Sequence, residues 1–160
     1  MAVDDKIRQT LATSRVVDLT STGRKSGQPH RMEIPIFNVD GRLFIVGDPR
    51  THDDKRELRP RDWYANLMAD SRCTLHLKTT FRIDLRASHP YVVGVLDYEN
   101  LIDADVPAVA KPVKDRAERQ RVLGDVLRRL RGSNMPGEVA DWVEHAPMVE
   151  VELVEAGSPA

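Results

Sequence analysis

Between Thr22 and Gly27 the chain reads Thr-Gly-Arg-Lys-Ser-Gly, so that two adjacent cations and a hydroxyl stand between two glycines. Glycines allow backbone N–H groups to turn toward a bound anion and form an anion-binding concavity. Arg24 offers a planar fork for phosphate or carboxylate, and Lys25 offers a mobile point charge. The glycine spacing and the order of Lys and Ser differ from those of a Walker loop. The segment therefore predicts an anion-binding turn, with a solvated surface turn as the alternative.

A second group of residues that could contact a ligand begins at Asp62 and reads Asp-Trp-Tyr-Ala-Asn-Leu. A tryptophan near the start of a helix can stack on a ring, and an amide one turn later can hydrogen-bond a polar group of the same ligand. Trp63 and Asn66 have this spacing. The alternative is that Trp63 and Leu67 pack in the core, while Asn66 caps the helix or lies on the surface.

The remaining reactive side chains form no recognisable site by their spacing. The histidines are scattered singly, and His52 is too close in sequence to its two aspartate neighbours for them to converge on one ion, so we expect no metal site. Cys73 falls on the apolar side of an expected strand and should be a small buried hydrophobe. No Ser-His-acid arrangement can be located by spacing, so the catalytic residue is unknown. The charges from Asp115 to Arg121 predict the solvated face of a helix.

The bulk composition excludes several classes of function. Lys+Arg 24 and Asp+Glu 25 give a net charge of -1, whereas bulk electrostatic capture of nucleic acid needs a strongly basic face. A single cysteine fits a reducing compartment, and the N-terminus is polar. No apolar run approaches the ~20 residues of a membrane-spanning helix. We expect a cytoplasmic protein that binds no nucleic acid and has no integral membrane segment.

The periodicity of the apolar residues predicts the elements that position these groups. Helices are expected near 3–11, at 62–68, at 123–130 with a cap at Gly132, and after Pro136. Strands are expected at 15–21, in a hairpin over 31–46 that turns at Asp40-Gly41, in a second hairpin over 72–87, at 91–96 and at 148–153. Pro35 should mark an edge or a bulge, and residues 103–112 give no firm pattern. The pattern favours a single antiparallel α+β domain over residues 1–160, in which barrel closure would remove exposed edges.

Three features together resemble one family: residues 20–31, the hairpin that follows them, and residues 63–70. The first and last read TSTGRKSGQPHR and WYANLMAD. Their order and separation are similar to those of the nitroreductase-type, deazaflavin-dependent oxidoreductases, which are related to pyridoxamine-phosphate oxidases. The resemblance covers residues 17–77, about half of the chain. It implies a split β-barrel of antiparallel strands with flanking helices.

The resemblance also implies a cofactor and a reaction. Members bind coenzyme F-420, an 8-hydroxy-5-deazaflavin with a phospholactate and oligoglutamate tail. Its reduced form transfers a hydride to an unsaturated ring, a quinone or a nitroaromatic. Arg24 and Lys25, assisted by Ser26, would hold the tail. The chain would thus be an oxidoreductase acting on a small organic acceptor, and a homodimer would fit the family.

Further contacts with the cofactor follow from the same resemblance. They are those of Gly47, Asp48, Pro49, Trp63 and Asn66 with the deazaflavin. Near the tail, His30 stands where many members have arginine, and Arg31 comes one position later. Because neighbours on a strand point to opposite faces, only one of these two side chains should reach the tail, and Arg31 is the expected contact.

Two alternatives stay open at the level of the sequence. A related barrel could hold flavin mononucleotide through the same turn, or a barrel could bind a ligand or a partner without catalysing hydride transfer. The long charged segment from Arg50 to Arg61 replaces the glycine-rich loop of the family and keeps the second alternative open. The acceptor is not identified, and neither is the tyrosine that would line its site.

Overall fold

The computed structural model of the chain describes residues 5–12, 15–47, 49, 62–77, 83–84, 95–96, 104–129 and 139–154. The helices are α1 (Asp5–Thr10), α2 (Asp62–Ala69), α3 (Arg116–Arg129) and α4 (Val139–His145). The strands are β1 (Arg15–Thr22), β2 (Pro29–Val39), β3 (Arg42–Val46), β4 (Arg72–Leu77), β5 (Ile83–Asp84), β6 (Val95–Leu96), β7 (Ala104–Pro112) and β8 (Met148–Leu153).

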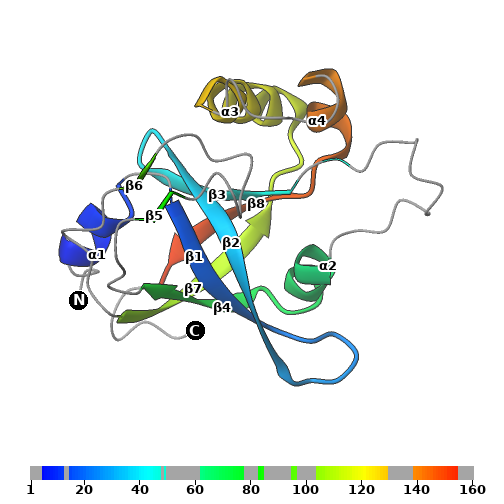
Figure 1. Cartoon of the computed structure of the whole chain (residues 1–160). Coiled ribbons are helices and arrows are strands. Elements are labelled where there is room, and N and C mark those ends of the chain that lie inside the picture. The colour runs from blue at the N-terminus through cyan, green and yellow to red at the C-terminus, as the bar shows by residue number, and fades with distance from the viewer. Residues whose placement is uncertain are drawn as a thin grey trace.

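Six of these strands close into a barrel in the order β1-β2-β3-β8-β7-β4 (Figure 1). All the pairings are antiparallel. Side chains alternate between the two faces of each strand, so β4 buries Cys73, Leu75 and Leu77 and leaves the intervening positions more exposed. Closure gives each of the six strands a neighbour on both sides, which answers the edge problem of an open sheet. The expected α+β split barrel with flanking helices is confirmed.

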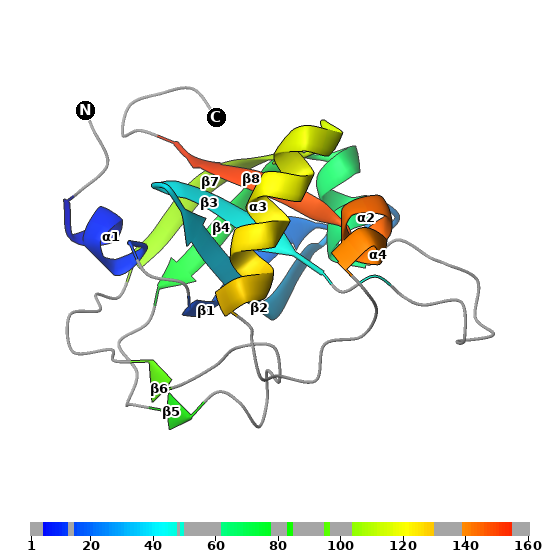
Figure 2. The same cartoon turned by 90° about the horizontal axis from the view of Figure 1, so that it is seen from above.

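Two hydrophobic clusters divide the buried side chains between the inside and the outside of the barrel. The interior is filled by residues such as Leu19, Ile45 and Leu75, none of which is exposed. The outer cluster joins Phe44 of β3 to Val126 of α3 and Trp142 of α4. Figures 1 and 2 show α3 and α4 packed together over β3 and β8. Both faces of β3 are therefore buried, which explains its continuous apolar sequence.

The two remaining helices lie toward opposite ends of the barrel (Figures 1 and 2). Helix α1 precedes β1 in the sequence, and Leu11, the residue that follows α1, is buried in the interior cluster. At the other end, Trp63 and Leu67 of α2 enter the same cluster. The spacing of these two residues had predicted one shared buried face, and the structure confirms it.

The hairpin between β2 and β3 has the predicted tight turn. Asp40 and Gly41 both have positive φ angles, 53° and 82°, as a two-residue hairpin turn requires. Asn38 supports the turn, because its side-chain oxygen accepts a hydrogen bond from the Gly41 N–H at 3.0 Å. Pro35 pairs with β1 only, since β2 joins β3 from Phe37 onward. Its missing N–H therefore costs no hydrogen bond to β3, as the expected edge position implied.

The predicted second hairpin over residues 72–87 is wrong. Its first half forms β4, but the neighbours of β4 are β1 and β7. Both edges of β4 are thus occupied, which leaves no free edge for a hairpin partner. Ile83 and Asp84 instead pair with Val95 and Leu96, which lie in the strand expected at 91–96.

Residues 103–112, which gave no firm pattern, contain the strand β7. Its buried positions are occupied by the small side chains Val106, Ala108 and Ala110, which give a weak alternating signal. Two prolines further obscured the signal. Pro107 is tolerated because its ladder partner is Thr74 of β4, while the pairing with β8 begins at Ala108.

The expected helices are present at the described positions. The stripe that includes Leu123, Val126 and Leu127 is buried on α3, and Trp142 and Val143 are buried on α4. Leu130, Gly132 and Pro136, which were expected to mark the end of one helix and the start of the next, lie outside the described residues.

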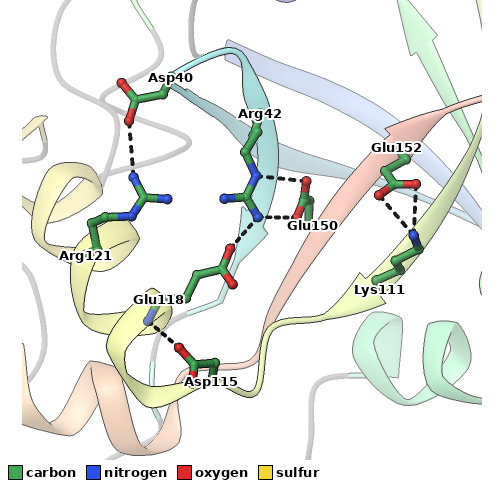
Figure 3. Close-up of polar contacts among 8 residues, drawn as sticks. All are labelled: Asp40, Arg42, Lys111, Asp115, Glu118, Arg121, Glu150 and Glu152. Atoms are coloured by element: carbon green, nitrogen blue, oxygen red, sulfur yellow. Dashed lines mark hydrogen bonds and ion pairs between the residues drawn. The ribbon is translucent and has the colours of Figure 1, made fainter.

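An ion-pair network fastens α3 to the barrel (Figure 3). The Arg42 guanidinium lies between Glu118 of α3 and Glu150 of β8, with its Nε 3.1 Å from a Glu150 oxygen. These two carboxylates raise the pKa of Arg42 above its ordinary value. Arg121 on the next turn of α3 reaches Asp40 at the hairpin tip at 3.1 Å. The network fixes the position of α3 along the outer face of β3 and β8.

Burial of Cys73 makes its thiol unreactive in the folded protein. The side chain is 7% exposed, and desolvation raises its pKa from 9.0 to about 11. We expect Ellman's reagent to leave the native protein unlabelled at about pH 8 and to label it fully in denaturant. Fast labelling of the native protein would contradict the barrel position of Cys73.

The buried thiol should also make stability depend on pH. Between the two pKa values only the thiol of the unfolded protein ionises, so this residue should lower the free energy of unfolding as the pH rises from 9 to 11.

Candidate functional site

Several of the expected ligand contacts lie at one end of the barrel, which we call the site end. β1 and β3 are both antiparallel to β2, so they finish at the same end. β4 and β8 start there, as the pairs Ser21 with Cys73 and Val46 with Met148 show. The turn after β1, Gly47 after β3 and helix α2 before β4 consequently lie toward the same end of the barrel, although they come from distant parts of the sequence.

The turn between β1 and β2 is closed by its own backbone. The Gly23 N–H donates to the Gln28 carbonyl at 2.8 Å, and the Gly27 N–H donates to the Gly23 carbonyl at 2.9 Å. Gly27 has a φ of 71°, a conformation that favours glycine. A methyl group on Gly23 would lie 2.6 Å from the ring of His30 and 2.7 Å from the Ser26 hydroxyl. The two glycines of the motif are thus needed for the shape and for the close packing of the turn.

A buried amide on α2 orients the first cation of the turn. The side-chain oxygen of Asn66 accepts hydrogen bonds from the Arg24 N–H at 3.1 Å and from Arg24 Nη1 at 2.9 Å. Asn66 is only 4% exposed, so this oxygen needs the partners that Arg24 provides. Asp62, one turn earlier on α2, accepts a longer bond from Arg24 Nη2 at 3.3 Å. The two sequence-predicted residues Arg24 and Asn66 are therefore in direct contact.

The outer part of the turn presents donors to solvent. Lys25 and Ser26 are exposed, and in the described part of the chain no carboxylate pairs with the Lys25 ammonium. Among the same residues, no acceptor is found for the backbone N–H groups of Lys25 and Ser26. The Arg24 side chain retains 32% exposure despite its contacts with α2. The turn therefore offers a guanidinium, an ammonium and two backbone donors on a local surface, which is the equipment of an anion site.

Trp63 has a core position in this structure. It is 5% exposed and belongs to the interior cluster, and the ring of Tyr64 packs edge-on to it with centroids 5.8 Å apart. Trp63 therefore packs in the core, which was the alternative to contact with a ligand. Asn66, for which a cap or surface position was the alternative, is buried instead. Contact of either side chain with a cofactor stays a prediction.

The segment after β3 is only partly described. The Gly47 N–H donates to the Pro147 carbonyl at 2.9 Å, which places Gly47 beside the start of β8 at the site end. Pro49 is buried, and Asp48 lies outside the described residues. The contacts of this segment with a deazaflavin ring stay a prediction, and Gly47 lies at the same barrel end as the basic turn.

The side chains of His30 and Arg31 diverge, as expected for neighbours on a strand. The His30 ring packs against Gly23 in the turn. Arg31 instead forms an ion pair with Asp18 of β1 at 2.9 Å, on the other face of the sheet. His30 therefore lies nearer the basic turn than Arg31, although Arg31 had been the predicted cofactor contact.

Two polar arrangements were not foreseen from the sequence. The expectation from spacing concerned Ser-His-acid arrangements only, whereas here a threonine provides the hydroxyl: Thr20 Oγ1 lies 2.6 Å from His76 Nε2, and His76 Nδ1 lies 2.7 Å from Asp105. These residues come from three neighbouring strands, β1, β4 and β7, and only the barrel pairing reveals the contact. Among the described residues, no group of His, Cys, Asp and Glu side chains could hold a metal ion.

The second unforeseen arrangement is formed by Arg119. The charge run from 115 to 121 was expected to be a solvated helix face, and for Arg119 this is wrong. Its side chain is partly buried and donates to four backbone carbonyls, including that of Ala146 at 2.6 Å. Hydrogen bonds to carbonyls depend on tertiary packing and leave no pattern in the sequence.

Comparison with known proteins decides the family. Residues 1–89, more than half of the chain, match the model of the F420H(2)-dependent quinone reductase family. The chain belongs to this family. This reductase is therefore an oxidoreductase whose cofactor is coenzyme F-420. No protein with a curated description matches its sequence.

Solved structures agree with the fold of the reductase at low sequence identity. A conserved hypothetical protein from Mycobacterium tuberculosis has a TM-score of 0.57 and 18% identity, with 100% of this chain and 91% of that one covered. A FAD-binding protein from Mesorhizobium loti has a TM-score of 0.54 and 12% identity, with coverages of 96% and 91%. A candidate pyridoxamine 5'-phosphate oxidase from Listeria innocua has a TM-score of 0.51 and 13% identity, with coverages of 95% and 92%. In the described part of the reductase, no helix is long and apolar enough to cross a membrane.

Replacing Asn66 tests whether α2 holds the turn. We expect Asn66→Ala to lower the free energy of unfolding by about 1–2 kcal/mol, because the Arg24 N–H and guanidinium lose a shared buried acceptor. The measurement is urea denaturation followed by circular dichroism. Met68→Ala is the matched control, since this residue lies on the same helix and is 39% exposed. Equal stability of the two variants would show that the Asn66 contacts are not needed to fix the turn.

Proposed function

We propose that this reductase transfers a hydride from reduced coenzyme F-420 to a quinone, and that the turn between β1 and β2 binds the anionic tail of the coenzyme. Arg24 and Lys25 provide the charges for phosphate and carboxylate groups, and Ser26 provides a hydroxyl. We choose a quinone as the acceptor because the chain belongs to the family of F420H(2)-dependent quinone reductases. An enone or a nitroaromatic is the acceptor to test next, because the same hydride chemistry applies to these compounds.

The contact between Arg24 and buried Asn66 is the observation that supports this proposal most strongly. A flexible arginine on a surface turn loses side-chain entropy when it binds an anion. Here the guanidinium already donates to Asn66 at 2.9 Å and to Asp62 at 3.3 Å, and the Arg24 backbone N–H donates to Asn66 at 3.1 Å. The Arg24 side chain stays 32% exposed, next to exposed Lys25 in the sequence. The turn is preorganised for an anionic ligand, and the net charge of -1 makes such a local cluster necessary.

The residues of the site fit the coenzyme in other respects. The packing of Gly23 against His30 leaves no space for a Cβ in the turn, and its outer N–H groups are available to oxygen ligands. We assign Gly47, Asp48 and Pro49 to the ring of the coenzyme, at the same barrel end. Trp63 and Asn66 support the site from the core. A tail contact by Arg31 would require its ion pair with Asp18 to open, so we assign His30 to the tail ahead of Arg31.

The division of labour between cofactor and protein follows from this assignment. The coenzyme, when bound, supplies the hydride. The chain binds the polyanionic tail at the basic turn and thereby orients the coenzyme at the site end. The apolar barrel interior beneath this end gives the site a rigid floor from which water is excluded. No side chain is assigned to proton transfer.

Two alternatives make different predictions for binding. A flavin-dependent enzyme would bind flavin mononucleotide through the same turn, since this cofactor also carries a phosphate. A non-catalytic barrel would bind neither cofactor. The match to F-420-dependent reductases favours the deazaflavin over both.

The organisation of the protein is proposed on the same basis. We propose that residues 1–160 act as one deazaflavin-binding domain, because the described strands from β1 to β8 form a single barrel. We further propose a cytoplasmic homodimer, for which the support is the family resemblance. Sedimentation of the purified reductase would reveal a monomer if the second part is wrong.

Removal of the two cations should separate the alternatives. We expect Arg24→Ala, Lys25→Ala to raise the Kd for coenzyme F-420 roughly a hundredfold, about tenfold for each charge-assisted contact that is lost. Titrations of wild type and variant with the deazaflavin, and with flavin mononucleotide, can be followed by tryptophan fluorescence. Turnover is then measured with the reduced coenzyme and a menu of quinone, enone and nitroaromatic acceptors.

The control for charge is a second double variant. Arg8→Ala, Arg128→Ala also removes two positive charges, from exposed positions on α1 and α3, and should leave the Kd within about threefold of wild type, since distant surface charges are screened by salt. An equal rise in the Kd of both variants would show that the turn contributes only through the overall charge of the protein. Binding of flavin mononucleotide alone would favour the flavin enzyme, and binding of neither cofactor would favour a non-catalytic barrel.

A further inference from the structure

The guanidinium of Arg119 donates hydrogen bonds to four backbone carbonyls from two segments of the chain, the end of α4 and the residue after β7. Its Nε donates to Val143 at 2.7 Å, and its Nη1 donates to Val113 at 2.9 Å. Its Nη2 donates to Ala146 at 2.6 Å and to Trp142 at 3.2 Å. Burial lowers the pKa of Arg119, which reflects the cost of removing the charge from water. A charge that is retained at such a cost requires the multiple donors that a planar guanidinium provides.

These contacts fix both sides of the start of β8. Val113 directly follows β7, whereas Trp142, Val143 and Ala146 belong to the C-terminal turn of α4 and the residue after it. The last carbonyls of a helix have no partners within the helix and carry its negative dipole end, so a cation there is favourable. Arg119 donates to two carbonyls of this last turn, Val143 and Trp142, and to the Ala146 carbonyl just beyond it, and so connects the end of α4 to the end of β7. The Trp142 carbonyl also accepts from the Ala146 N–H at 3.0 Å.

Arg119 is itself held on a rigid base. Asp115 caps the start of α3, because its side-chain oxygen accepts a hydrogen bond from the Glu118 N–H at 3.0 Å. One turn later, Val122 and Leu123 are completely buried against the barrel. Arg119 can therefore transmit the position of α3 to the segments that it contacts.

The segment that Arg119 constrains leads directly to the site end. Pro147 lies between Ala146, whose carbonyl is bound to Arg119, and Met148, whose carbonyl accepts from the Val113 N–H at 3.0 Å. With both neighbours held, the direction of the Pro147 carbonyl is set. This carbonyl accepts the 2.9 Å hydrogen bond from Gly47.

We propose that Arg119 is a positioning residue, which fixes Gly47 for contact with the deazaflavin through the Pro147 carbonyl. The proposal rests on the function proposed above for its cofactor part, and on the hydrogen bonds alone for its mechanical part. Arg119 does not touch the coenzyme. It acts through the junction between α4 and β8, where it fixes the orientation of the Pro147 carbonyl and thereby of the Gly47 backbone.

Two variants of Arg119 and one control test the proposal. Arg119→Met removes the donors and the charge, whereas Arg119→Lys keeps the charge but not the planar fork. Arg116→Met is the control, because Arg116 is on the same helix and also reaches α4, through an exposed ion pair with Glu144 at 3.0 Å. For each protein, amide hydrogen exchange is measured by NMR without ligand, with the amides of β4 as the internal reference. The Kd for coenzyme F-420 is then measured from the absorbance of the coenzyme, since Trp142 contacts Arg119.

We expect Arg119→Met to speed exchange at Gly47 at least tenfold relative to β4 and to raise the Kd roughly tenfold, because a displaced backbone contact costs orientation. Arg119→Lys should restore part of both effects, and Arg116→Met should match wild type. Uniformly faster exchange, with the Gly47-to-β4 ratio unchanged, would overturn the positioning role in favour of general stabilisation. If Arg119→Met does not fold, the Lys variant decides by the same ratio. Failure of wild type to bind the coenzyme would overturn the proposed function, and with it the cofactor part, while the exchange ratio still decides the mechanical part.

Discussion

A buried amide oxygen must find hydrogen-bond donors inside the protein, and the oxygen of Asn66 finds them in the turn after β1. This requirement joins α2 to a turn that lies 42 positions earlier in the sequence. It also removes freedom from Arg24 before any ligand arrives. The surface turn and the buried helix face thereby become one unit, in which the core determines where the positive charge lies.

The barrel makes this unit possible through its strand directions. Antiparallel pairing with closure places the end of β1, the end of β3 and the start of β4 at one end. Packing of Trp63 and Leu67 in the interior then holds α2 at that end. On the outside, α3 and α4 cover β3 and β8 and bring Arg119 to the junction before β8. The site end is thus supported from the interior of the barrel and from the helices outside it.

The sequence predicted the parts of the fold that carry strong local patterns. Alternation of apolar and polar residues predicted β1, β2, β3 and β8, and Asp40-Gly41 predicted the turn between β2 and β3. These signals depend on adjacent residues only. β7 was missed because Ala108 and Ala110 give little contrast and Pro107 interrupts the pattern. The partner of β4 was wrong because alternation defines a strand without defining its neighbour. In the site, the basic turn and Asn66 were predicted from a motif, whereas the four carbonyl contacts of Arg119 exist only in the folded chain.

The turn around Arg24 is the proposed anchor for the tail of the coenzyme. The most direct measurement compares the Kd of the wild-type reductase for coenzyme F-420 with its Kd for the same deazaflavin lacking the phospholactate and glutamate tail. If the turn provides the main anchor, loss of the tail should weaken binding roughly a hundredfold or more, since several charge-assisted contacts disappear together. Equal Kd values for the two compounds would contradict the account and would place the binding energy at the ring.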